Sequence, residues 1–404
     1  MPVEFRAIRA DELDDLRSAV GFAFGFDPHP DDHGFSAVVP LDRTRCGFDN
    51  GRIISTSAAF SLQMTVPGGV VPCGGTTIVS VSPTHRRRGV MREMMRSHLD
   101  DVRDHEEPLA ALWATDSAIY GRFGFGCAAV CHEIEVKRAH VDLSRLAPEP
   151  APVRPLDVDE AAAVLPAFFD SVRGAIPGFY ARDPKWWEHR HFSDLEHRRE
   201  GMTKHRYVVV DSGDGIAGYA QYRSKFGWDE GHPAGHLEVL ELIGTTPESW
   251  AGLWAYVLNH DLLERITADI RPPWDPLFDL LAGTRRVGAK RSDSMWVRIM
   301  DVPAALSARA YSGPVDLVLA VSDPIGDTTG AYQLRVDGET VECAVTGKEP
   351  DVTLDLEDLS ACYMGRARFR ELARAGRVSG EGAALAELDR AFTWDPQPWC
   401  PEVF

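Results

Sequence analysis

Apolar residues recur at helical spacing between residues 89 and 106, and a run rich in β-branched residues lies shortly before them. The run, Thr76-Thr-Ile-Val-Ser-Val81, is typical of a strand. A Gly- and Arg-containing turn separates this strand from the helix. The pattern also predicts a strand over 109–114, a short helix over 117–123 and a final strand over 127–136. The positions that share one face of the long helix are Met91, Met94, Met95, Leu99 and Val102.

A second block repeats this order of elements about 160 residues later. It has apolar strands over 207–210, 217–222 and 236–243. A turn and an apolar helix that extends to Leu258 follow. The arginine-rich turn of the first block is absent here. We therefore predict a duplicated fold whose second copy has lost the ligand site.

A third block begins near residue 291 and has a different pattern. Alternating residues predict strands over 315–321, 332–336, 341–345 and 352–356, and two helical segments follow near 359–365 and 369–376. This order is typical of an α+β domain, so the fold class of the whole chain is mixed α/β and α+β. A Pro-rich stretch over 147–155 is predicted to be a linker. The expected domains are 1–148, 149–290 and 291–404.

Composition narrows the class of partner. The net charge of −18 argues against nucleic acid and anionic membranes, and suits a cationic substrate, although acidity also serves solubility alone. The seven cysteines contain no Cys-x-x-Cys pair, so we expect reduced thiols and no metal. The first residues lack an apolar signal region, and no stretch approaches 18 apolar residues. We expect a cytoplasmic protein.

The segment Arg86-Arg-Arg-Gly89 lies between the strand and the long helix. Backbone N–H groups at a helix N-terminus, supplemented by arginines, suit the pyrophosphate of an acyl-CoA. The strand would offer its backbone to the pantetheine amides. The alternative is a basic surface loop that caps a helix. The predicted cofactor-binding residues are Val79, Ser80, Val81, Arg86, Arg87, Arg88, Gly89, Val90, Met91, Arg92, Thr115 and Asp116.

Three motifs together resemble the enhanced-intracellular-survival (Eis) family of GCN5-related N-acetyltransferases. They are Pro83-Thr-His-Arg-Arg-Arg-Gly89, Ala118-Ile-Tyr-Gly-Arg-Phe-Gly-Phe-Gly126 and Trp296-Val-Arg-Ile-Met-Asp-Val-Pro-Ala-Ala-Leu306. The first motif is common to a superfamily, whereas the other two are specific. The resemblance spans nearly the whole chain. It implies acetyl-CoA as cosubstrate and two acetyltransferase-type domains followed by a sterol-carrier-protein-like domain. It also implies a homohexamer, built as a trimer of dimers.

The resemblance also implies two catalytic groups. Tyr120 would be the general acid for the departing thiolate, since its ordinary pKa of about 10 exceeds that of a thiol. The terminal carboxylate of Phe404 would be the general base. A free α-carboxyl has a pKa of only about 3.3–3.7, so burial or a water relay would have to help it. The alternative for Tyr120 is an aromatic side chain that packs in the core. The alternative for Phe404 is a C-terminal segment that packs for stability.

For the acceptor, the resemblance implies a large acidic and aromatic pocket. Phe24, Asp27 and Glu402 are the expected wall residues, although core packing is an equal alternative for the aromatics near Phe24. The family often has an acidic penultimate residue, and Val403 departs from that pattern. The expected reaction is acetylation of primary amines of aminoglycoside-like polycations. Protein lysines or polyamines are alternative acceptors, and a non-catalytic protein that carries an apolar ligand in the C-terminal domain is the alternative class.

Overall fold

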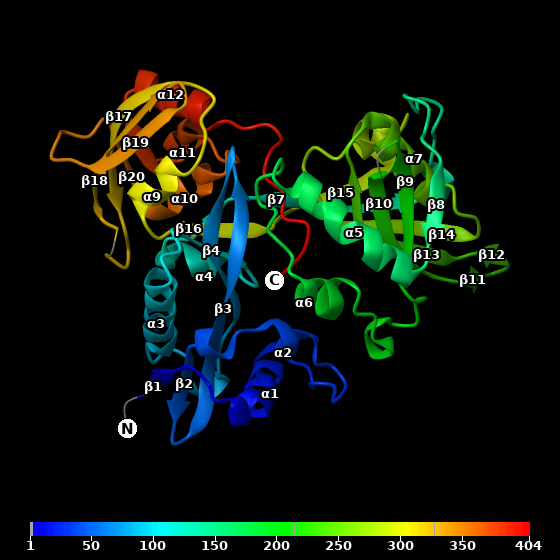
Figure 1. The fold of residues 1–404 in the computed structure, drawn as a ribbon, viewed down its shortest axis with the longest axis horizontal. Coiled ribbons are helices and arrows are strands. Elements are labelled where there is room, and N and C mark those ends of the chain that lie inside the picture. The colour runs from blue at the N-terminus through cyan, green and yellow to red at the C-terminus, as the bar shows by residue number, and fades with distance from the viewer. Residues whose placement is uncertain (1–2, 214, 327) are drawn as a thin grey trace. The chain divides into compact units, whose positions relative to one another are not determined.

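The computed structural model describes residues 3–213, 215–326 and 328–404, which form two compact units (Figure 1). The first unit combines residues 3–129 with Gly174–Ala181 and Asp293–Phe404. The second unit combines Val130–Arg173 with Arg182–Ser292. Within the described residues, no helix is both long and apolar enough to cross a lipid bilayer. The predicted domain limits at residues 148 and 290 stay a prediction.

The first sheet of unit one has the strand order β1-β2-β3-β4-β5-β16-β6. Its long central hairpin, β3 and β4, turns at residues 67–68 and is buried along most of its length. Strand β5 runs parallel to β4, as a crossover helix between them requires. The strands are β1 (Glu4–Arg6), β2 (Cys46–Asp49), β3 (Arg52–Val66), β4 (Gly69–Val81), β5 (Leu109–Trp113), β6 (Gly126–Cys127) and β16 (Met295–Ile299).

Strand β16 comes from a distant part of the chain and lies between β5 and β6. Met295 pairs with Trp113 and Ile299 pairs with Leu109, so β16 covers the full length of β5. All five residues of β16 are buried, which suits a strand covered on both faces. The predicted single strand over 127–136 is wrong. It divides at residues 128–129 into β6 and β7 (Val130–Lys137), because β7 joins the sheet of the second unit.

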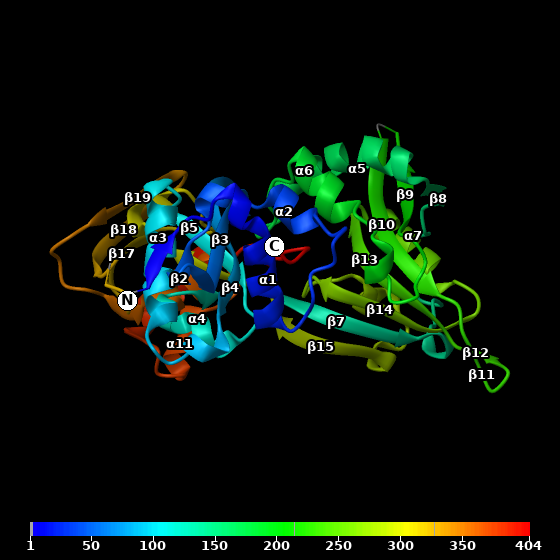
Figure 2. The same ribbon diagram turned by 90° about the horizontal axis from the view of Figure 1, so that it is seen from below.

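Helices cover both faces of this first sheet. Figures 1 and 2 show α1 and α3 on opposite sides of β3. The apolar face of α3 packs on a core that includes Leu112, Phe125 and Trp296, and the predicted helix over 89–106 is confirmed. Gly25 ends α1 in the left-handed conformation, at a φ of 80°. The helices are α1 (Leu13–Phe24), α2 (Gly34–Val38), α3 (Val90–Asp104) and α4 (Ser117–Tyr120).

A second sheet in unit one has the order β19-β18-β17-β20-β21. The four predicted strands and two helices of the third block are confirmed, whereas α9, β21 and α12 were not predicted. The strands are β17 (Val315–Ser322), β18 (Gly330–Asp337), β19 (Thr340–Val345), β20 (Val352–Asp355) and β21 (Val378–Gly380). The helices are α9 (Val302–Ser307), α10 (Leu356–Tyr363), α11 (Phe369–Arg374) and α12 (Gly382–Phe392).

Unit two repeats the strand–helix–strand arrangement of the first sheet. Strand β13 pairs in parallel with β14, and α7 connects them, as α3 connects β4 with β5. The predicted second copy of the fold is therefore confirmed. The sheet order is β15-β7-β14-β13-β10-β9-β8. Its remaining strands are β8 (Val153–Leu156), β9 (Arg206–Ser212), β10 (Gly215–Lys225), β13 (Gly235–Gly244), β14 (Leu263–Arg271) and β15 (Val287–Asp293).

Two small features complete unit two. Strands β11 (Trp228–Asp229) and β12 (His232–Pro233) form a short hairpin of their own. Strand β8 begins inside the stretch that was predicted to be a linker, because its residues pair with β9 from Val153 onward. The helices are α5 (Val158–Arg173), α6 (Pro184–Trp186), α7 (Pro247–Leu258) and α8 (Leu277–Leu280).

Candidate active site

Strands β4 and β5 separate near the middle of the first sheet. They pair only from Cys73↔Leu109 to Gly75↔Ala111, although β4 continues to Val81. The backbone of Ile78 has a φ of 48°, and the ladder between β3 and β4 shifts register between Thr56 and Ala58. This bulge bends β4 away from β5. Beyond Gly75, the edge of β4 that faces β5 therefore pairs with no described strand, and residues 79–81 lie on this edge.

The turn after β4 leads directly into α3. Gly89 caps the helix with a φ of 81°, and a Cβ atom built on it would meet no other atom within 4 Å. Arg87 also has a positive φ, of 62°. The Arg86 Nε atom donates a hydrogen bond to the Val81 carbonyl at 3.3 Å. The turn thus presents backbone N–H groups and arginines at a helix N-terminus, which is the arrangement that binds phosphates.

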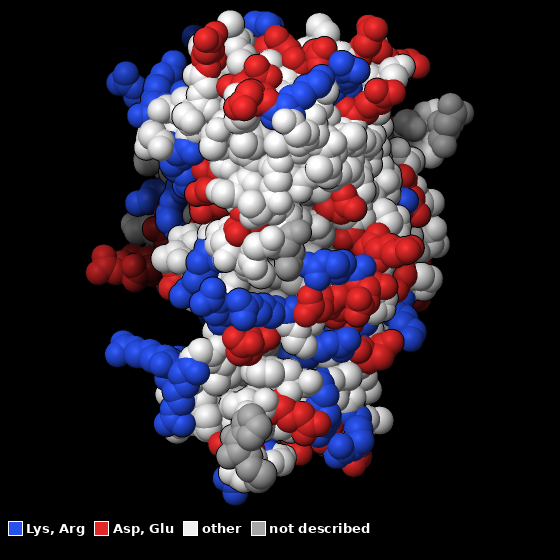
Figure 3. Space-filling view, turned by 90° about the vertical axis from the view of Figure 1, so that its left-hand side faces the viewer, with Lys and Arg blue, Asp and Glu red and all other residues white. Residues whose placement is uncertain are grey.

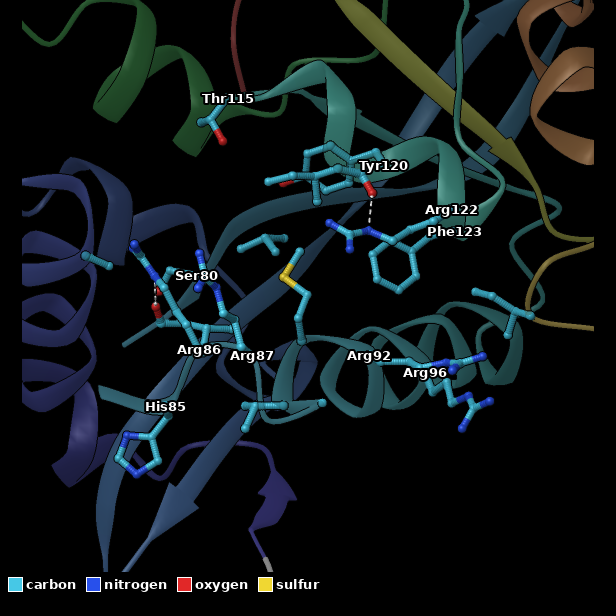
Figure 4. A pocket seen from close by; sticks show the side chains of 18 of the residues that line it. Ser80, His85, Arg86, Arg87, Arg92, Arg96, Thr115, Tyr120, Arg122 and Phe123 are labelled. Carbon is cyan, nitrogen blue, oxygen red and sulfur yellow. Dashed lines mark hydrogen bonds between the residues drawn. The ribbon is translucent and has the colours of Figure 1, made fainter. Parts of the chain in front are cut away.

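A cavity of about 1020 Å³ lies beside this turn (Figure 4). It is lined by residues of α1, β4, the turn, α3, α4 and the segment just after α4, and by two residues that follow β17. Ten of the twelve predicted cofactor-binding residues line it, whereas Arg88 and Asp116 do not. The lining residues are Ala23, Phe24, Val79, Ser80, Val81, His85, Arg86, Arg87, Gly89, Val90, Met91, Arg92, Arg96, Thr115, Ile119, Tyr120, Arg122, Phe123, Pro324 and Ile325.

The predicted residues outside the lining have identifiable structural positions. The Asp116 carboxylate accepts a hydrogen bond from the Ala118 backbone N–H at 3.0 Å and so caps α4. Arg88 is an exposed residue of the turn. The His85 ring is hydrogen-bonded to the Thr84 hydroxyl at 2.8 Å and to the Asp49 carboxylate at 3.2 Å.

Tyr120 lies at the end of α4 and is only 4% exposed. Its ring meets Phe125 edge-on, with centroids 6.0 Å apart. Burial raises the pKa of the Tyr120 hydroxyl, and the Asp116 charge adds to this, while hydrogen bonding with Thr115 opposes it. The hydroxyl therefore remains protonated across the neutral range, which is the state that a general acid needs.

The C-terminal segment is also ordered against unit one. Phe404 is 5% exposed, and its ring stands edge-on to Tyr180. The backbone of Tyr180 forms an isolated antiparallel β-bridge with Met64 of β3. The Trp399 backbone N–H donates to the Pro177 carbonyl at 2.9 Å. Figures 1 and 2 both show the end of the chain beside β3. Phe404 does not line the cavity that contains Tyr120.

The predicted acceptor residues are not gathered in this cavity. Phe24 lines it, whereas Asp27 and Glu402 do not. Asp27 is exposed just beyond α1, and Glu402 is half-buried near the terminus. Phe22, Phe24 and Phe26 are 69%, 43% and 53% exposed, so these aromatics do not belong to the core. All three lie exposed at or just beyond the end of α1.

Sequence reasoning missed several lining residues. Arg96 follows Arg92 by one helical turn, so its position was predictable from the helix period. Arg122 belongs to the motif Ala118–Gly126, but the sequence predicted no role for it. Pro324 and Ile325 lie about 200 residues later in the chain, and no local pattern connects them with Tyr120.

Comparisons with protein-family models match three segments of the chain. Residues 4–128 and 178–299 each match an acetyltransferase (GNAT) domain, and residues 302–401 match a sterol carrier protein domain. The first GNAT match covers six of the seven strands of the first sheet, the turn and Tyr120, and leaves out β16. The duplicated acetyltransferase fold and the sterol-carrier-protein-like domain predicted from the sequence are thus confirmed.

Relatives and solved structures agree with these matches. An N-acetyltransferase of Streptomyces avermitilis is 35% identical, over all of both chains. The N-acetyltransferase Eis of Mycobacterium tuberculosis is 32% identical, over 89% of this chain and 87% of its own. The crystal structure of Eis1 from Mycobacterium abscessus superimposes with a TM-score of 0.85 at 27% identity, over all of both chains.

Proposed function

Because this chain belongs to the Eis family of GCN5-related N-acetyltransferases, we propose that it acetylates primary amines of aminoglycoside-like polycations. The observation that carries the proposal is a single cavity that joins the open edge of β4, the Arg86–Gly89 turn and the buried Tyr120 hydroxyl. The GNAT fold implies acetyl-CoA as the cosubstrate. Acetyl-CoA supplies an acetyl group that is activated as a thioester.

The residues present suit acetyl-CoA. The free edge of β4 beyond Gly75 can pair with the pantetheine amides. Arg86, Arg87 and the N-terminus of α3 can bind the pyrophosphate, and the open space at Gly89 allows the phosphates to approach the backbone.

Two proton transfers are assigned to the chain. The Tyr120 hydroxyl donates a proton to the sulfur of the leaving thiolate, and burial keeps it protonated until then. The Phe404 carboxylate accepts the proton of the attacking amine. Because Phe404 does not line the Tyr120 cavity, this second transfer requires an intervening water or a bound acceptor that reaches both groups.

Charge and aromatic surface support a polycationic acceptor. The chain has a net charge of −18, which favours the approach of cations. The exposed rings of Phe22, Phe24 and Phe26 can contact ammonium groups, and Asp27 follows Phe26 directly. Of these three residues, Phe24 lines the cavity.

The test is thiol release from acetyl-CoA with kanamycin or neomycin as acceptor. A polyamine such as spermidine, a lysine-containing peptide and buffer alone serve as comparison acceptors. We expect the largest kcat/KM for the aminoglycosides. A larger kcat/KM for the peptide or the polyamine would identify that compound class, in place of the aminoglycosides, as the acceptor. No thiol release with any amine would contradict the enzymatic function and favour a carrier role, which lipid retained on purification would then support.

We also propose that the protein assembles as a homohexamer, a trimer of dimers, as the family resemblance implies. Light scattering coupled to size-exclusion chromatography tests this directly. The expected mass is six times the 44.6 kDa of one chain. A monomeric mass at micromolar concentration would contradict the assembly.

A further inference from the structure

Unit two contains a cavity of its own, at the place in the fold that corresponds to the cavity of unit one. It has a volume of about 430 Å³ and lies at the turn between β13 and α7, as the cavity of unit one lies at the turn between β4 and α3. In both units, further lining residues come from the segment that follows the next strand, β14 or β5. Strand β13 also separates from β14 after Val239↔Ala268, although it continues to Gly244. The second copy of the fold has therefore kept a cavity at the equivalent position.

The turn of unit two is closed to phosphate. The Ser249 hydroxyl oxygen accepts hydrogen bonds from the backbone N–H groups of Thr245 at 3.1 Å and Thr246 at 3.0 Å. The Ser249 backbone N–H in turn donates to the Thr246 hydroxyl at 3.1 Å. These N–H groups at the start of the helix are thus already satisfied. Within the described chain, no lysine or arginine lines this cavity. An acyl-CoA or another phosphate ester is therefore a poor fit.

The Pro-rich segment 147–151 forms part of the cavity wall. The Ala151 backbone N–H donates a hydrogen bond to the Glu248 carbonyl at 3.1 Å, and a Cβ atom on Gly252 would clash with the Ala151 carbonyl oxygen. The segment therefore lies directly against the first turns of α7. Ala147 and Pro148, a few residues earlier, are lining residues. The segment thus brings the Pro148 ring to the cavity.

Most of the lining is flat and apolar. Pro148, Pro247 and Pro276 contribute proline rings, and Trp250 contributes an indole. Trp250 is only 8% exposed, and the ring of Trp274 meets it edge-on with centroids 6.2 Å apart. An indole packed in this way offers a fixed aromatic surface to a ligand. The volume of the cavity lies near the small end of the range for ligand sites, which favours a small molecule with a flat apolar body.

Asp279 is the single charged residue among those that line this cavity. It is exposed on α8, and no cationic side chain of the described residues lies within 4.0 Å of its carboxylate. The face of unit one that carries α3 differs, because Lys and Arg are interspersed there with Asp and Glu (Figure 3). An uncompensated carboxylate beside an aromatic ring attracts a cation and disfavours an anion.

We propose that the cavity of unit two binds a small organic cation with a flat apolar body, such as an aryl ammonium ion. Asp279 pairs with the cationic group, and the Trp250 indole and the proline rings contact the apolar body. The first copy of the fold thus binds an anionic cosubstrate at this position, whereas the second copy binds a cation. The site lies within unit two and requires no acetyl-CoA, so the inference goes beyond the proposed function.

Fluorine NMR of the full-length protein labelled with 5-fluorotryptophan tests the site. The probe is phenyltrimethylammonium, whose quaternary nitrogen cannot be acetylated. The chain has ten tryptophans, and the resonance of Trp250 is the one that Trp250→Phe removes. Because this resonance reports on one cavity, binding elsewhere does not interfere. We expect it to shift and to saturate with a dissociation constant on the order of 1 mM. A Trp250 resonance that does not move would overturn the proposal.

The charge of the ligand is tested with a second probe and a second variant. N,N-dimethylaniline has one methyl group fewer and is uncharged near neutral pH, so we expect it to bind about threefold more weakly or worse. Asp279→Asn should weaken phenyltrimethylammonium by about two- to fivefold and leave the neutral probe unchanged. Asp261→Asn is the matched control, because Asp261 is exposed in unit two and does not line the cavity. Equal affinity for both probes, or unchanged affinity in Asp279→Asn, would overturn the cation assignment.

Equilibrium dialysis of the same probe decides if Trp250→Phe does not fold. Asp279→Asn should then bind less phenyltrimethylammonium than Asp261→Asn, and equal binding by the two variants would contradict the site. The titrations contain neither acetyl-CoA nor an acceptor amine. Failure of this site and failure of acetyl transfer are therefore separate results.

Discussion

The ring of Phe404 stands edge-on to the ring of Tyr180, with centroids 5.5 Å apart and planes at 82°. This contact anchors the last residue of the chain against a segment that pairs with β3. A terminal carboxylate held in this way has a fixed position, unlike that of a frayed tail.

Extension of the C-terminus by three glycines should therefore abolish acetyl transfer. The extension replaces the terminal carboxylate of Phe404 with a neutral peptide group, which cannot accept a proton. We expect kcat to fall about a hundredfold or more, the usual contribution of a general base. CoA affinity and the melting temperature of unit one should change little. Turnover equal to that of the unmodified protein would exclude Phe404 as the base.

Tyr120→Phe should lower kcat by about a hundredfold or more while CoA affinity is retained. The change removes only the hydroxyl and keeps the ring contact with Phe125. Because burial raises the pKa of Tyr120, the acid form persists until the pH rises past the ordinary value of about 10. The pH–rate profile of the wild-type protein should thus show no loss from this group below about pH 10. Full activity of Tyr120→Phe would show that another proton donor serves.

His98 should make the stability of the protein dependent on pH. It is fully buried beside Thr76, at 2.8 Å, and burial lowers its pKa to about 4. The unfolded chain takes up this proton near the ordinary pKa of about 6.5, so stability falls as the pH drops from 6.5 towards 4. Between pH 7 and 5 the loss should be on the order of 2 kcal/mol. The melting temperature of His98→Gln should depend less on pH than that of the wild-type protein. Parallel plots of melting temperature against pH for the two proteins would contradict this prediction.

Gly124→Ala should destabilise unit one by about 1–3 kcal/mol. Gly124 has a φ of 76°, and a Cβ atom at this position would overlap the guanidinium of Arg298. Gly51→Ala is the matched control, since Gly51 has a φ of 77° and open space around it. The difference between the two melting temperatures measures the clash of the new Cβ atom with Arg298 and Leu356. Equal shifts would mean that Arg298 can move aside without cost.

A fragment of residues 1–148 should not form a stable catalytic domain. It lacks β16, so β5 and β6 would each expose an unpaired edge, and exposed edges promote aggregation. We expect the fragment to be insoluble or to melt without cooperativity. Co-expression with residues 293–404, which carry β16, should increase its solubility. A soluble fragment with a cooperative melt would show that β16 is dispensable.

Much of the fold and part of the site were predictable from local pattern. The helical period of residues 91–102 and the turn at Arg86–Gly89 together predict a strand, a turn and a helix, and the structure contains all three. The second copy was predictable for the same reason, because α7 and its flanking strands repeat the pattern. These features depend on neighbours in sequence.

The features that were missed depend on partners far along the chain. The split of residues 127–136 at Ala128 occurs because β16 pairs with Cys127, and nothing near residue 128 encodes that partner. Ile325 lines the cavity from a distant part of the chain, beside Asp323, which pairs with the buried Arg298 of β16. The acceptor residues Asp27 and Glu402 were inferred by resemblance, and the structure does not gather them with Phe24.

The insertion of β16 into the first sheet also has a consequence during synthesis on the ribosome. The catalytic sheet is complete only after residue 299 has emerged, although its neighbour β5 ends at Trp113. At the usual rates of translation, the growing chain holds an unfinished sheet for on the order of ten seconds or more. During that interval the edge of β5 is available to chaperones or to other nascent chains. Because the chain is synthesised from its N-terminus, the first acetyltransferase domain can complete its sheet only after the second domain has been synthesised.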